Sequence, residues 1–122
     1  MAVTTGQRVL GYYAALVGEV THARATPALR QGMSQHFPIP VALIARLAVD
    51  AGAQGRGIGA ALLRDALVRS VAAGEHVGIR GVVVHAIDEA AAQFYERHGF
   101  TSLTDEPRTL MMTLATIRAS RA

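Results

Sequence analysis

The chain has no cysteine and no lysine, and only 17% of its residues are charged. Without cysteine it can form no disulfide, thiolate metal site or cysteine nucleophile. Without lysine it cannot form a P-loop, whose phosphate-binding motif requires that residue. No apolar run reaches membrane-spanning length without an interrupting Gly, Arg or Asp, and the first residues do not resemble a signal peptide. We therefore expect a cytoplasmic protein that does not act in a membrane.

The composition predicts one globular domain spanning residues 1–122, since 51% of the residues are apolar and the length suits a single core. All 12 basic residues are arginine, and the net charge is +3. A GC-rich genome explains this bias as well as an anionic partner does, because guanidinium groups bind phosphate well. Composition leaves both explanations open.

The apolar patterns predict an α/β (α+β) fold with a mixed central sheet flanked by helices. Residues 8–20 are apolar on both alternations, which is typical of a strand buried on both faces. We expect a hairpin turn at Gly6 and Gln7, a long loop over residues 21–40, and a frayed tail after Arg118. The remaining expected strands are residues 1–5, 41–49, 80–86, 100–103 and 109–117, and the expected helices are residues 58–73 and 89–98.

The local signals around the helices are specific. Asp88 suits an N-cap and Gly99 suits the position after a helix end. Asp65 and Arg69 are spaced to form an ion pair on the first helix. Gly74 and Gly78 indicate where that helix ends.

The most informative segment lies between the strand at 41–49 and the helix at 58–73. It reads Gln54, Gly55, Arg56, Gly57, Ile58, Gly59. A strand that turns through glycines into a helix presents backbone N–H groups and the positive helix end to an anion such as a pyrophosphate. The dinucleotide fingerprint requires Gly-x-Gly-x-x-Gly, which this spacing does not match. A plain tight turn is the competing interpretation.

A second motif lies at Ala91, Phe94, Tyr95, Gly99 and Phe100. Together with the glycine segment, it resembles the Gcn5-related N-acetyltransferases (GNAT). The wider pattern from about Gly6 to Leu114 is similar to the TacT-like GNAT toxins. That resemblance implies the GNAT fold, acetyl-CoA as donor, the amine of aminoacyl-tRNA as acceptor, a ribbon-helix-helix antitoxin as partner, and a homodimer.

Family members carry a strand and two helices before the hairpin with which this chain begins. Met1 falls inside what the resemblance makes the second strand, so we expect a GNAT domain whose N-terminal part is missing. The coenzyme half is complete in the pattern, whereas the acceptor side is not. Losing a sheet edge also favours pairing with another chain.

The resemblance implies roles for individual residues. Leu47, Ala48 and Val49 would pair their backbone with the pantetheine arm, and the segment from Gln54 to Gly59, Arg56 included, would bind the pyrophosphate. Ala91 and Phe94 would pack beside the coenzyme. Tyr95 would be the general acid that protonates the departing thiolate, since a phenol with a pKa near 10 suits donation.

The acceptor side has weaker candidates. Arg46 and His85 are possible substrate contacts, although a strand-end histidine held by backbone groups is the simpler interpretation of His85. The other histidines show no metal-ligand spacing, so no metal is expected. Two alternative functions stay open: a GNAT acting on a small-molecule or protein amine, and a non-catalytic CoA-binding or interaction module.

Overall fold

The computed structural model of the chain describes residues 2–5, 8–49, 54–55, 57–103 and 106–121. It contains a six-stranded sheet in the order β1-β2-β3-β4-β6-β5. The strands are β1 Ala2–Thr5, β2 Arg8–Val20, β3 Ile39–Val49, β4 Gly81–His85, β5 Thr101–Ser102 and β6 Thr109–Thr113. The helices are α1 Pro27–Arg30, α2 Ile58–Val77, α3 Glu89–Arg97 and α4 Leu114–Arg121.

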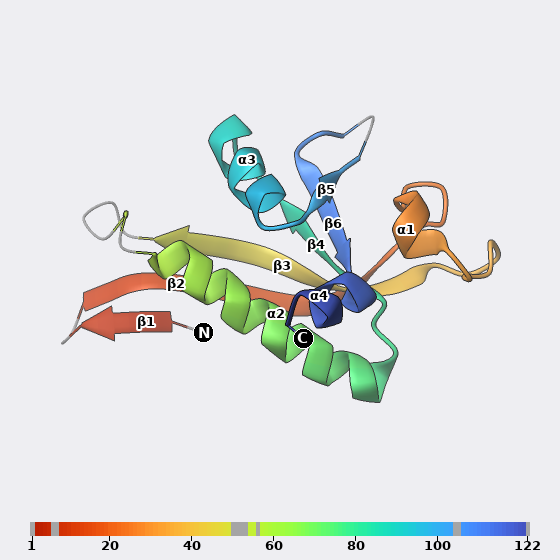
Figure 1. Cartoon of the computed structure of the whole chain (residues 1–122), viewed down its shortest axis with the longest axis horizontal. Helices are drawn as coiled ribbons and strands as arrows, with labels where there is room; N and C mark the ends of the chain where they lie inside the picture. The colour runs from red at the N-terminus through yellow and green to blue at the C-terminus, as the bar shows by residue number, and fades with distance from the viewer. Residues whose placement is uncertain (1, 6–7, 50–53, 56, 104–105, 122) are drawn as a thin grey trace.

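The sheet is mixed, as the sequence predicts. β3 and β4 run parallel, and the other neighbouring strands pair antiparallel. Figure 1 shows α2 lying across β2 and β3, with α3 at the far end of β4. The predicted turn at Gly6 and Gln7 lies outside the described residues.

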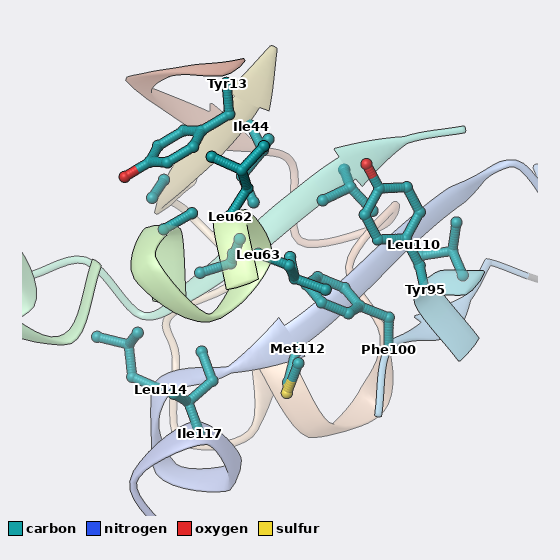
Figure 2. Close-up of a cluster of buried hydrophobic side chains, with 14 of the residues drawn as sticks. Tyr13, Ile44, Leu62, Leu63, Tyr95, Phe100, Leu110, Met112, Leu114 and Ile117 are labelled. Atoms are coloured by element: carbon teal, nitrogen blue, oxygen red, sulfur yellow. The ribbon is translucent and has the colours of Figure 1, made fainter. Parts of the chain in front are cut away.

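Each face of the sheet carries a hydrophobic cluster. The larger one joins the sheet to α2, α3 and α4 through Leu62, Leu63, Tyr95 and Ile117 (Figure 2). The smaller one packs Leu29 of α1 against the opposite face. Ion pairing of Asp65 with Arg69 at 2.9 Å, and the N-cap bond from Ala91 N to Asp88 Oδ1 at 2.8 Å, confirm two of the local predictions.

The prediction that residues 8–20 are buried on both faces is wrong. Tyr12, Leu16 and Val17 of β2 are 39%, 51% and 63% exposed. β2 lies next to the edge strand β1, so fewer elements cover its two faces than cover the central strands.

Four predicted boundaries also need correction. The expected loop over residues 21–40 contains α1, which begins after the N-cap Thr26, and β3 already starts at Ile39. The strand predicted for residues 109–117 ends at Thr113, and the chain then forms α4 through Arg121 instead of a frayed tail. Thr113 Oγ1 accepts from Thr116 N at 3.1 Å and so caps this helix.

The helix predicted to end at residue 73 continues to Val77 and ends at Gly78, whose φ is +72°. Gly74 therefore has another role. A Cβ on Gly74 would lie 2.3 Å from Leu114 Cδ1, so the missing side chain lets α4 approach α2 closely.

Candidate functional site

A β-bulge in β3 opens the sheet. Across the ladder to β2, Ala14 pairs with Arg46 but Ala15 pairs with Ile44, so Ala45 is an extra residue. A bulge bends a strand and reverses its alternation of faces beyond the extra residue. Accordingly Ile44 before the bulge, and Leu47 and Val49 after it, all pack on the same cluster.

The pairing of β3 with β4 stops at the same place. Its register runs from Val41 with Gly81 to Ile44 with Val84. Over the described residues, β3 continues from Ala45 to Val49 with β2 as its only ladder partner. The edge of β3 that faces away from β2 is therefore available to an extended ligand, which can pair with it as a strand would.

The glycine segment follows at the end of β3. Gly55 and Gly57 have φ values of +84° and +76°, which other residues adopt only with strain. Gly57 is the N-cap of α2 and offers no side-chain cap, so the first N–H groups of the helix are left for another acceptor. Gln54 Nε2 donates to Val49 O at 3.3 Å and ties the segment to β3. Arg56 lies outside the described residues.

A groove of about 590 Å³ connects these features and is here called the donor groove. It runs between the end of β3, the start of α2 and α3. Of the residues predicted to bind a coenzyme, it is lined by Leu47, Val49, Gln54, Gly55, Gly57, Ile58, Gly59, Ala91 and Phe94. The sequence interpretation missed Ala60, Ala90 and Arg97, which also line it.

A second groove of about 480 Å³, here called the acceptor groove, adjoins the donor groove and shares some of its lining residues. It contains Arg46 and His85, the two predicted substrate contacts, and also Ala48. Tyr12 and Ile87 line it as well and were not singled out from the sequence. The sequence signal for Tyr12 is the Tyr12–Tyr13 pair within β2, since adjacent strand residues face opposite sides and one ring must leave the core face.

The two grooves share Leu47, Ala91 and Tyr95. Tyr95 is only 6% exposed, and its ring packs edge-on against Phe94 and Phe100 at centroid distances of 5.3 and 5.6 Å. Figure 2 shows its hydroxyl directed away from Phe100. Burial raises the pKa of the Tyr95 phenol, so it stays protonated at neutral pH.

Among the described residues, the hydrogen-bond partner of the His85 ring is a side chain, whereas the simpler interpretation expected backbone groups. Its Nδ1 lies 3.1 Å from Oγ1 of the buried Thr109. Arg24 pairs with Glu106, and neither residue lines the two grooves. Among the described residues, no group of acidic or histidine side chains could hold a metal ion, and no helix is long and apolar enough to cross a membrane.

Comparison with known proteins agrees with this geometry. A family model described as an acetyltransferase (GNAT) domain matches residues 2–102. A tRNA-acetylating toxin of Mycobacterium tuberculosis is 43% identical over 112 residues, which cover 92% of this chain and 66% of that protein. The chain thus spans just under two thirds of this relative's length.

Two solved structures are similar throughout. AtaT complexed with acetyl-methionyl-tRNAfMet has a TM-score of 0.83 at 30% identity, covering 93% of this chain and 68% of that one. A mutant AtaT toxin bound to acetyl-CoA and to the C-terminus of the antitoxin AtaR has a TM-score of 0.76 at 30% identity, covering 93% and 63%.

Proposed function

Because the chain belongs to the GNAT acetyltransferase family, we propose that it transfers an acetyl group from acetyl-CoA to a primary amine, that of an aminoacyl-tRNA, as the toxin of a toxin–antitoxin system. The observation that carries the proposal is the meeting of two grooves at Leu47, Ala91 and Tyr95. A donor and an acceptor that enter from opposite sides would react there. The relatives that acetylate tRNA or bind acetyl-CoA support the same chemistry.

The donor groove fits acetyl-CoA by its chemistry. The unpaired edge of β3 at Leu47, Ala48 and Val49 matches the amides of a pantetheine arm. The uncapped start of α2 beside Gly57 matches a pyrophosphate. Gly59 lies between Val49 and Phe94, since a Cβ there would sit 3.6 and 3.7 Å from their side chains, so these residues wall the entrance. Arg56 is proposed as a further phosphate contact.

The chain's own groups then assist acyl transfer. Acetyl-CoA supplies an activated thioester carbonyl. A backbone N–H at the free β3 edge would bind the carbonyl oxygen as charge develops on it. Tyr95, buried and protonated, would donate its hydroxyl proton to the departing sulfur.

The acceptor groove favours a nucleic-acid-linked amine. Arg46 places a fixed positive charge on its wall, and Tyr12 adds an aromatic ring. Guanidinium groups bind phosphate, and aromatic rings stack on bases. We propose that the reaction takes place in the cytoplasm, where aminoacyl-tRNA is found, within the single domain 1–122, and that a ribbon-helix-helix antitoxin controls it.

The test compares acetyl transfer to aminoacyl-tRNA with transfer to small amines. Tyr95→Phe should lower kcat on tRNA by about 10²-fold or more, the range of a lost general acid, while CoA affinity is unchanged. Tyr13→Phe, whose ring lies outside both grooves, is the matched control.

Full activity of Tyr95→Phe would remove the general-acid role. Turnover of small or protein amines without acetylation of tRNA would contradict the toxin hypothesis and support an acetyltransferase that acts on those amines. Coenzyme binding without turnover of any amine would favour a binding module.

A further inference from the structure

We infer that His85 is the base that takes the proton from the acceptor amine, and that Thr109 and Glu106 orient it for this step. The inference rests on the proposed function and assigns a role in its acceptor half. It starts from a chain of three side chains at the edge of the acceptor groove.

The donor and acceptor of each hydrogen bond among these three side chains can be assigned. Thr109 Oγ1 lies 3.3 Å from Glu106 Oε2, and a carboxylate can only accept, so the threonine donates its one proton there. Thr109 Oγ1 can then only accept from His85 Nδ1, 3.1 Å away. Nδ1 therefore carries the proton of the neutral ring, and Nε2 is left as an acceptor.

The elements hold this arrangement firmly. Thr109 is 7% exposed and pairs with His85 across the β4–β6 ladder. Thr109 N also donates to Glu106 O at 3.0 Å, which closes the turn between them. Glu106 is held in turn by its ion pair with Arg24. A base oriented by a second group, itself oriented by a third, is the arrangement expected of a catalytic histidine.

Nε2 belongs to a ring that lines the acceptor groove together with Tyr95. The other polar side chains on that groove are Arg46 from β3 and Tyr12 from β2. Among the described residues that line it, no carboxylate competes with the histidine for the role of base.

The step balances without another reactant. The amine nitrogen forms a bond to the acetyl carbon, and the carbon–sulfur bond breaks. The acceptor arrives mostly as an ammonium, and Nε2 of His85 takes one of its protons before the nitrogen attacks. Tyr95 gives a proton to sulfur, and the acylated nitrogen loses a second proton, which returns through solvent to Tyr95. His85 releases its proton to solvent, which restores both groups.

The kinetic test measures kcat/KM against pH. An α-amine has a pKa near 8, so at pH 7 most of it is protonated and help with deprotonation matters most. His85→Gln should lower kcat/KM by about 10-fold at pH 7, the factor set by one pKa unit, and the loss should shrink toward pH 9. Thr109→Val should lower kcat/KM by a smaller factor, and that loss should also shrink toward pH 9. His98→Gln and Thr101→Val, which lie outside the acceptor groove, should match the wild type.

A second measurement does not depend on turnover. Long-range proton–nitrogen NMR should find the neutral His85 ring protonated at Nδ1 in the wild type. In Thr109→Val, a larger fraction of the His85 rings should be protonated at Nε2. A wild-type ring protonated at Nε2 would overturn the inference, as would a pH-independent loss in His85→Gln.

Failure of this inference differs from failure of the proposed function. Wild-type kinetics in His85→Gln, together with a large loss in Tyr95→Phe, would remove the base and leave the acetyltransferase. No transfer to any amine by the wild type would overturn both.

Discussion

At the scale of single residues, Tyr13 of β2 links the sheet to α2. Its hydroxyl donates to Asp65, which also accepts from Arg69 Nε at 2.9 Å. Burial and the bond to Asp65 raise the pKa of Tyr13 from 10.0 to about 12. The hydrogen bond from Tyr13, followed by the charge of Arg69, lowers the pKa of Asp65 against the opposing effect of burial. Asp65 therefore stabilises the fold above its unfolded pKa, and that contribution is lost in acid.

Above pH 9 the dependence of stability on pH is simple to interpret, because the chain has no lysine or cysteine that would titrate in the same range as tyrosine. Unfolded Tyr13 loses its proton near pH 10, whereas the folded form keeps it to about 12. Between these values the folded state binds more protons, so the free energy of unfolding should fall as pH rises through this window. Urea unfolding from pH 9 to 12 measures the fall, and Tyr13→Phe should make it shallower. Tyr95 contributes in the same direction, since its pKa is also raised. An equally steep fall in Tyr13→Phe would contradict the assignment.

At the scale of elements, the packing of α4 on α2 depends on Gly74. Gly74→Ala gains helix propensity, about 1 kcal/mol, but its methyl group would meet Leu114 Cδ1 at 2.3 Å. Overpacking costs about 1–3 kcal/mol, so the substitution should be neutral to destabilising in thermal or urea unfolding.

A double-mutant cycle isolates the cause. In a Leu114→Ala background the contact with Leu114 Cδ1 is removed and the backbone oxygen of Ile79, at 3.3 Å, stays close. Gly74→Ala should then be less destabilising than in the wild type, or stabilising by up to about 1 kcal/mol. The same change in both backgrounds would show that Leu114 is not the reason for the glycine. Leu114→Ala alone should cost about 2–5 kcal/mol, because Leu114 is buried.

Elements with one clear local signal were predictable from the sequence, and those that depend on tertiary contacts were not. Asp88 and Gly99 mark the two ends of α3 as expected: Asp88 is its N-cap, and Gly99 follows its last turn with φ +95°. Gly74 reads as a stop signal because its packing partner is 40 positions away in the sequence. Leu114 continues the alternation of Leu110 and Met112, which favours a longer strand, whereas Ile117 lies at the helical spacing of three from Leu114. Burial of both in the cluster that α2 joins favours the helix.

The site was predictable in the same uneven way. The donor groove contains nearly all the residues that the motifs indicated, because they lie in two short segments, Leu47–Gly59 and Ala91–Phe94, that each carry a local motif. Thr109 and Glu106 lie 24 and 21 residues after His85, and only the β4–β6 pairing brings them to it.

At the scale of the whole molecule, the side of the sheet formed by β1 and β2 is thinly covered. Leu16 is 51% exposed and lies across the ladder from Leu43. We expect the chain to self-associate through this side, since exposed apolar strands near a sheet edge favour pairing. Light scattering over a range of concentrations measures the mass.

Leu16→Ser should shift this equilibrium toward the monomer. Phe37→Ser is the control, because Phe37 is 70% exposed but precedes β3 and does not belong to the β2–β3 ladder. A constant monomer mass for the wild type would contradict the expected homodimer.

The extra residue Ala45 has a consequence for the molecule as a whole. On one side of Ala45, β3 pairs with both β2 and β4, and on the other side β2 is its only ladder partner among the described residues. Without Ala45, Ile44, Leu47 and Val49 would fall into ordinary alternation on one face. One inserted residue thus coincides with the point where β3 parts from β4 and the donor groove begins, and its removal would shift the register of every β3 residue beyond it.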